Sequence, residues 1–193
     1  MNHPAVNFVG QQIGWFACVV GAANGHPWLG VGVAAALIVL HLQGAPDPAR
    51  ELRLILVASA LGVVLESGFQ AAGLLTYASP WRAVPWLCPP WIAALWAQFA
   101  TLLRGGLSRL QGRPLLGGLV GAVGGPLAFR AGEGLGAVQF APARWATYLA
   151  LAVVWGAVLP FLSWLAARDA RPSPDSAPVA GSGPAEPGDA TAS

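Results

Sequence analysis

The residues of this chain that could do chemistry are ionisable and amide side chains set inside long apolar stretches. Glu66, Arg130 and Glu133 each interrupt such a stretch. An ionisable group in hydrocarbon is expensive, so it is usually paired, turned toward other helices or functional. Counting about 1.5 Å of helix per residue places all three in the middle or outer part of a membrane. We therefore predict one polar cluster in the outer half of the membrane, made of Glu66, Gln70, Gln98, Arg130 and Glu133.

Two interpretations of this cluster stay open. In the structural one, Arg130 pairs with Glu133 three residues later, or with Glu66 on another helix, and the pair holds the bundle together without doing chemistry. In the functional one, Glu66 carries a proton or anchors a polar headgroup, while the planar guanidinium of Arg130 holds a phosphate or carboxylate. The structural interpretation is the simpler of the two.

A second polar group is predicted nearer the inner side of the membrane, made of Asn7, Gln11, Gln12 and His41. We expect Gln11 or Gln12 to bond to His41 across a helical hairpin, which satisfies both side chains. The three histidines lack metal-ligand spacing, so we predict no metal site and no cofactor. A G-x-G-x-x-A pattern at residues 30–35 lies inside an apolar stretch and not after a strand, which argues against nucleotide binding.

The elements that must position these residues are membrane helices. Of 193 residues, 55% are hydrophobic and 9% charged, whereas soluble domains carry about a quarter charged residues. The apolar stretches predict an all-α, polytopic membrane helical bundle with six transmembrane helices. These helices cover residues 8–23, 28–43, 52–77, 90–103, 115–140 and 145–167 of a single domain, residues 1–168. Residues 169–193 are rich in Pro, Ala, Gly and acidic residues, and we predict a disordered tail.

The arginines predict how the bundle is oriented, because loops on the cytoplasmic side collect positive charge. Lysine is absent, so arginine is the only fixed cation. Placing both termini in the cytoplasm leaves Arg82 and Arg144 outside, and puts the following arginines inside: Arg50, Arg53, Arg104, Arg109, Arg113, Arg168 and Arg171. A net charge of +2 is too small for a nucleic-acid surface. The expected partners are membrane lipids.

The fifth predicted helix carries a small residue at every fourth position, in two series. These are Gly117, Gly121 and Gly125, and then Gly124, Ala128, Gly132 and Gly136. Small residues at this spacing let helix backbones approach closely inside a membrane. We expect this helix to lie at the centre of the bundle, and a homodimer formed through its glycine face is the alternative.

Several short stretches together form a recognisable pattern. They are Asn7-Phe8, Gln11 with Gly14-Trp15, Glu66-Ser67, Pro90-Trp91, Leu95-Trp96, Phe99-Ala100-Thr101, Gly124-Gly125-Pro126-Leu127-Ala128, Ala131-Gly132 and Leu135-Gly136-Ala137. With these residues the chain resembles domain-of-unknown-function family 2878, nearly throughout as far as Ala167. The resemblance implies a multi-pass protein of the bacterial inner membrane without an assigned activity, and it hints at a link with membrane-lipid modification.

Two positions depart from that family's pattern. Glu66 stands where the family more often has Asp, which keeps the carboxylate. Arg104-Gly105-Gly106 stands where the family has Asn-His-Ser, so any role of that histidine does not carry over to this chain.

Three functions stay open from the sequence. The favoured one is a structural or accessory protein linked to envelope lipid metabolism, which is not an enzyme and has a packed bundle without a solvent-connected cavity. A small-solute or proton-coupled transporter would need a water-accessible path to Glu66. An intramembrane lipid-modifying enzyme would need a lateral opening between helices onto the polar cluster.

Overall fold

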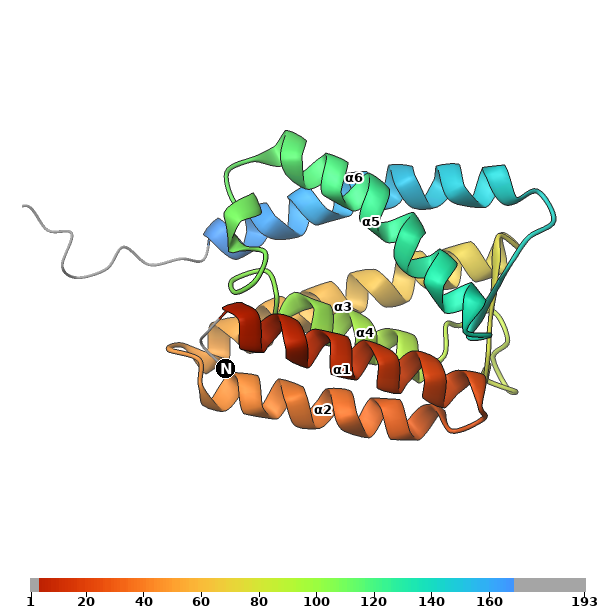
Figure 1. Cartoon of the computed structure of the whole chain (residues 1–193), viewed down its shortest axis with the longest axis horizontal. Coiled ribbons are helices and arrows are strands. Elements are labelled where there is room, and N and C mark those ends of the chain that lie inside the picture. The colour runs from red at the N-terminus through yellow and green to blue at the C-terminus, as the bar shows by residue number, and fades with distance from the viewer. Residues whose placement is uncertain (1–3, 169–193) are drawn as a thin grey trace, which may run out of the picture.

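Six α-helices lie roughly along the long axis of the molecule in the computed structural model, which describes residues 4–168 (Figure 1). They are α1 (Pro4–Ala23), α2 (Pro27–Gln43), α3 (Pro48–Ala71), α4 (Pro90–Ala100), α5 (Pro114–Gly134) and α6 (Arg144–Arg168). The first five each begin with a proline, whose missing N–H has no helical partner at that position anyway. The predicted tail, residues 169–193, lies outside the described residues.

The prediction of a helical chain with several helices apolar enough to span a membrane is confirmed. Of the described helices, α1, α3, α5 and α6 are long and apolar enough to cross a membrane. The apolar helix α2 is shorter, with 17 residues, and α4 has 11. The outer faces carry large apolar side chains such as Val64, Leu115 and Trp145. Such a continuous apolar surface matches lipid better than water.

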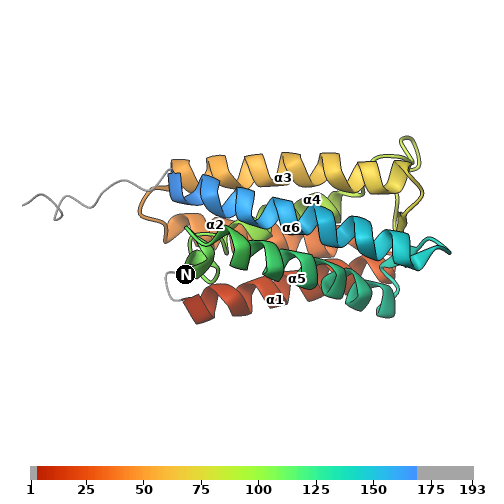
Figure 2. The same ribbon diagram turned by 90° about the horizontal axis from the view of Figure 1, so that it is seen from above.

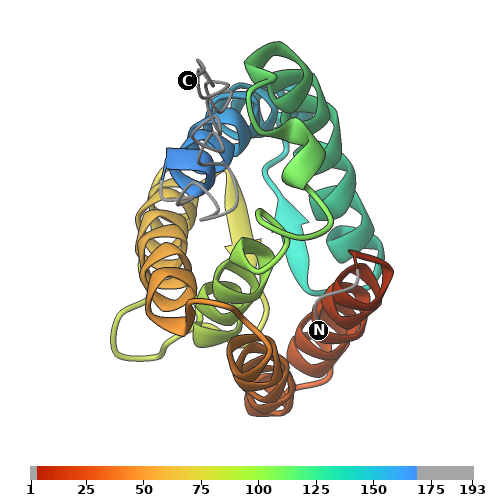
Figure 3. The same ribbon diagram turned by 90° about the vertical axis from the view of Figure 1, so that its left-hand side faces the viewer.

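Successive helices run in opposite directions along the bundle (Figure 1). The start of α1 and the end of α6 therefore lie at the same end of the molecule, next to the connections that follow α2 and α4. The view along the bundle places α4 toward the inside, with α1 and α5 as neighbours on one flank (Figure 3). These arrangements set which side chains can meet at the site described below.

The third and fifth helices are shorter than the predicted residues 52–77 and 115–140. α3 ends at Ala71 and α5 at Gly134, and the residues that follow form an antiparallel two-stranded sheet of β1 (Leu75–Tyr77) and β2 (Val138–Phe140). Gly73 and Gly136, between helix and strand, both have positive φ angles, of 69° and 83°. A glycine in this conformation ends a helix, but the apolar run continues beyond it, so hydropathy alone missed the change.

The fourth predicted helix, residues 90–103, also ends early. Helical geometry stops at Ala100, and turns continue to residue 107. The other helices begin and end within four residues of the predicted bounds.

The glycine pattern led us to expect the fifth helix at the centre of the bundle. This prediction is wrong. It packs along α6 (Figure 2), and its outer face is open, with Leu119 67% and Leu127 63% exposed. A Cβ on Gly121 would lie 2.1 Å from the Trp155 carbonyl oxygen, and one on Gly125 2.4 Å from the Trp155 ring. The small residues therefore serve close contact with one neighbour rather than burial on all sides.

This contact predicts how two neighbouring glycines respond to the same substitution. Gly121→Ala should lower the free energy of unfolding by about 1–3 kcal/mol, because the new methyl group meets backbone that cannot move aside. Gly124→Ala is the matched control, since no atom lies within 4 Å of the Cβ position there. Thermal unfolding in detergent, followed by intrinsic fluorescence, measures both. Equal melting temperatures for the two variants would contradict the α5–α6 packing.

Candidate functional site

The centre of the candidate site is Glu66, a fully buried carboxylate on α3. Its Oε2 accepts a hydrogen bond from the Tyr77 hydroxyl of β1 at 2.5 Å, and its Oε1 accepts one from Trp96 Nε1 of α4 at 3.1 Å. Buried polar groups need such partners. Gly62, one turn earlier on α3, leaves room for the indole, because a Cβ there would lie 2.1 Å from the Trp96 ring. The carboxylate thus ties α3, β1 and α4 together.

A cavity of about 590 Å³ lies beside this carboxylate. Its volume falls in the range of small-molecule sites, about 300–1,000 Å³. Glu66, Tyr77 and Trp96 form part of its wall. Most of the remaining wall is apolar, and its other aromatic side chains are Phe8, Trp15, Trp91, Phe99, Phe129 and Trp155.

The small residues of α5 make space for this cavity. Gly124, Ala128 and Gly132, from the second glycine series, line it together with Gly121 and Gly125. Large side chains at these positions would occupy the volume. The two predicted series therefore have different surroundings: Gly117, Gly121 and Gly125 lie against α6, whereas Gly124 lies next to open space.

The cavity opens between α1 and α5 on the apolar flank of the bundle. Phe8 of α1 is 52% exposed and lines the cavity, and so do the exposed Val120 and Leu127 of α5. Residues that both line a cavity and reach the surface mark its mouth. Since these side chains are apolar, the mouth faces the region where lipid tails would lie.

The structure does not join the five residues predicted as one polar cluster. Gln98 turns toward α1, where its Nε2 donates to the Gly10 carbonyl at 2.9 Å. Gln70 Nε2 donates to carbonyls of the 78–89 connection, including that of Leu87 at 3.4 Å. Residues at similar depth thus face different neighbours, because depth along a helix says nothing about direction around it.

Arg130 and Glu133 form a separate group at the end of α5. The Arg130 guanidinium lies 3.5 Å from the Glu133 carboxylate, and Arg144 also pairs with Glu133. The i,i+3 pair named in the structural interpretation is therefore present. Arg130 is half-exposed and does not line the cavity, so this guanidinium and Glu66 act in different places.

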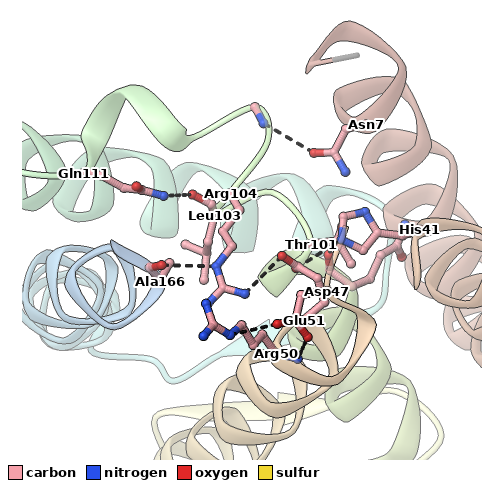
Figure 4. Close-up of polar contacts among 12 residues, drawn as sticks. Asn7, His41, Asp47, Arg50, Glu51, Thr101, Leu103, Arg104, Gln111 and Ala166 are labelled. Carbon is pink, nitrogen blue, oxygen red and sulfur yellow. Dashed lines mark hydrogen bonds and ion pairs between the residues drawn. The ribbon is translucent and has the colours of Figure 1, made fainter. Parts of the chain in front are cut away.

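The second predicted polar group also has other partners than expected. His41 Nε2 lies 3.2 Å from Glu51 Oε2, so the predicted bond to Gln11 or Gln12 is wrong. Arg104 donates from Nη1 to Glu51 Oε1 and from Nε to the Ala166 carbonyl, both at 3.1 Å (Figure 4). This partly buried network joins α2, α3 and α6.

Sequence reasoning missed Glu51 because it stood at the edge of a loop rich in proline and charge. The available signal was spacing: Glu51 follows Asp47, the N-cap of α3, by four residues, and so belongs to the first turn of that helix and not to the loop. Asn7, also predicted in this group, accepts from the Gly106 amide at 3.4 Å (Figure 4). Gln11 and Gln12 line the cavity.

Among the described residues, no group of three His, Cys, Asp or Glu side chains could hold a metal ion. Cys18 and Cys88 are buried and free.

Comparison with known proteins matches the chain to a family. A family model described as "Protein of unknown function (DUF2878)" matches residues 4–161. No curated protein and no solved structure matches the chain.

The Glu66 contacts predict a graded effect on stability. Glu66→Leu removes the acceptors of two buried donors and should lower the free energy of unfolding by about 1–3 kcal/mol for each. Glu66→Gln should recover most of this loss, since its carbonyl accepts from Trp96 and its amide can donate to the Tyr77 oxygen. Glu133→Leu is the control and should change stability by less than about 1 kcal/mol, because its partners are half-exposed. Thermal unfolding in detergent ranks the variants, and equal losses for Glu66→Leu and Glu133→Leu would refute the assignment.

Proposed function

The chain belongs to the DUF2878 family, as its sequence pattern predicted, and we propose that it is a membrane protein that binds a lipid-like molecule in the cavity between α1 and α5. The function is that of an accessory protein of envelope lipid metabolism, which holds this molecule within the bilayer. The packed bundle that the sequence led us to expect for such a protein is replaced here by a bundle with a lateral cavity. The observation that carries the proposal is an apolar cavity that opens on the apolar flank and reaches a buried carboxylate.

The lining of the cavity supports a lipid over a small polar solute. A path for a polar solute needs polar side chains along its length, whereas aromatic and aliphatic residues dominate this wall. Glu66 is fully buried, and both of its oxygens accept hydrogen bonds from the protein. These features favour lipid binding over the transporter that the sequence also left open.

A lipid-modifying enzyme is the second candidate, and one observation favours it. The Glu66 carboxylate lies in the wall of a cavity that opens laterally, which is the geometry expected of an intramembrane lipid enzyme. Both of its oxygens already accept hydrogen bonds, and the Cys88 thiol is buried, so binding is the simpler function.

In the membrane, we place all six helices as spans of a bacterial inner-membrane protein, with both termini in the cytoplasm. The alternating directions of the helices support this, and so do the arginines at the end of the bundle where α1 starts. α4 reaches only about 17 Å. Its non-helical flanks can lie at membrane depth because several of their residues, including Cys88 and Leu103, are buried in protein.

Reporter fusions test this arrangement. Alkaline phosphatase, which is active only outside the cytoplasm, should be active when inserted after Gly25 and inactive after Gly44 or Arg168. Activity after Arg168 would refute cytoplasmic placement of both ends.

A cavity-filling substitution tests lipid binding. Gly124→Phe places a ring in the open space of the cavity, whereas Gly68→Phe places the same ring on the exposed face of α3, again with no atom within 4 Å of the Cβ position. We expect lipid that co-purifies with the protein, measured by mass spectrometry, to fall about tenfold in Gly124→Phe, equivalent to about 1.4 kcal/mol. Gly68→Phe should retain it.

The same pair of variants tests the metabolic link. Deletion of the gene should change the membrane lipid profile, and Gly68→Phe, but not Gly124→Phe, should restore it. Equal lipid retention in the two variants would refute the cavity as the binding site. An unchanged lipid profile after deletion would refute the role in lipid metabolism.

A further inference from the structure

We propose that Gln12, at the mouth of the cavity, hydrogen-bonds the polar group of the bound lipid, and that this group is uncharged. The inference rests on the proposed function, and it names the class of the ligand and its orientation. The apolar chain lies inside the cavity, and the polar group stays at the mouth between α1 and α5. The inference comes from the place of Gln12, from its lack of a partner and from the charges of the cavity wall.

Gln12 is an exposed residue of α1 that also lines the cavity. Phe8, one turn earlier on the same face of α1, is 52% exposed and lines the cavity as well. Trp15 and Val19 continue this face and line the cavity too, but Trp15 is half-buried and Val19 is buried. Along α1 the cavity is therefore open at Phe8 and Gln12, and it closes at Trp15 and Val19.

The Gln12 amide makes no hydrogen bond with another residue in the described part of the chain. The side chains of α5 across the mouth cannot provide one, because the α5 residues that line the cavity are all apolar or glycine. Lipid tails cannot provide one either. A polar amide in apolar surroundings is costly without a hydrogen-bond partner. A polar group of the bound lipid supplies this partner.

A second copy of the chain fits this position less well than a lipid. Helices that associate within membranes meet through small residues, which let their backbones approach. Phe8, Val9, Ile13 and Phe16 surround Gln12 on α1, and each is more than half exposed. These large side chains would hold a second helix away from the amide, whereas a flexible lipid chain can pass between them into the cavity.

The cavity wall provides no charge to balance a charged headgroup. Among the described residues that line it, none is Arg or His, so nothing there neutralises a phosphate or a carboxylate. Glu66 is acidic, but it is fully buried and both of its oxygens already accept hydrogen bonds, so an ammonium group finds no open carboxylate. A neutral group such as an amide needs no counter-ion. It can accept from the Gln12 amide nitrogen and donate to the Gln12 carbonyl oxygen.

The depth of Gln12 separates this ligand from ordinary phospholipids. Gln12 lies about 12 Å along α1 from its first residue, Pro4. In the proposed membrane arrangement this position is inside the hydrocarbon core, which is about 30 Å thick. Phospholipid headgroups lie at the surface of that core, and charged groups enter it at high cost. The ligand is therefore a lipid with a neutral polar group, such as a fatty amide or a long-chain alcohol.

Brominated probes test the class of the ligand on the full-length protein in detergent. Bromine quenches tryptophan fluorescence on contact, and Trp15, Trp91, Trp96 and Trp155 line the cavity. We expect dibromostearamide to quench saturably. Its affinity should be at least about tenfold higher than that of dibromooctadecane, which has no polar group besides its bromines, a difference of about 1.4 kcal/mol. Dibromostearic acid at pH 8 and dibromostearylamine should also bind at least about tenfold more weakly than the amide.

The possible failures of this experiment are distinguishable. Equal or tighter binding of the acid or the amine would overturn the uncharged class, and equal or tighter binding of the hydrocarbon would overturn recognition of a polar group. Both results would leave lipid binding in the cavity intact. Absence of saturable quenching by every probe would overturn the proposed function as well.

Substitutions test Gln12 itself. Gln12→Leu should reduce the preference for the amide over the hydrocarbon to within about twofold, because leucine forms no hydrogen bond. Gln12→Asn, whose amide reaches less far, should reduce it at least about threefold. Gln43→Leu is the matched control, since Gln43 is exposed and outside the cavity wall, and it should keep the preference. An unchanged preference in either Gln12 variant would overturn the assignment, so one variant is sufficient if the other fails to fold.

The oligomeric state of the same proteins tests the alternative partner. Analytical ultracentrifugation in detergent should give the same state for the unchanged protein and for Gln12→Leu. Conversion of a dimer into a monomer by this substitution, with the probe preference unchanged, would assign Gln12 to a contact between two copies of the chain and overturn its role in lipid binding.

Discussion

The fold around the candidate site depends on the solvation of one carboxylate. Glu66 is fully buried on α3, and the protein must replace the water it would otherwise have. Tyr77 and Trp96 provide the two donors. Tyr77 can do so only because α3 stops at Ala71 and the chain returns as β1, and Trp96 only because Gly62 lets α4 approach α3. The strand, the end of α3 and the close contact between α3 and α4 together provide the two hydrogen bonds that this buried side chain needs.

The small residues of α5 show how one sequence pattern can serve two purposes. Gly121 and Gly125 bring the helix close to α6, where larger side chains would meet Trp155. One position away around the helix, Gly124 and Ala128 leave the volume that becomes the cavity. The two series share a spacing of four residues but point in different directions around the helix. Close packing and empty space therefore lie on neighbouring faces of α5.

The setting of the cavity explains why a few polar atoms matter there. In water, burial of the apolar wall would drive binding by itself. In a membrane, lipid tails already surround the protein, and apolar contact distinguishes little. In the proposed lipid site, selectivity therefore depends on the few polar side chains that line the cavity, such as Gln11, Gln12 and Glu66. The His41–Glu51–Arg104 network lies apart from the cavity wall and joins helices.

The sequence by itself identified the family and a helical chain with several helices apolar enough to span a membrane. It also placed the start of every helix within four residues of the observed one, because prolines mark most of these starts. It also singled out Glu66, because a carboxylate in an apolar run always needs a partner. Only the tertiary structure decided which partners it has. Hydropathy gives the depth of a residue but not its direction around the helix, so Gln98 and Arg130, predicted beside Glu66, face elsewhere. Tyr77 was hidden in the strand that follows a glycine, where an unbroken apolar run reads as more helix.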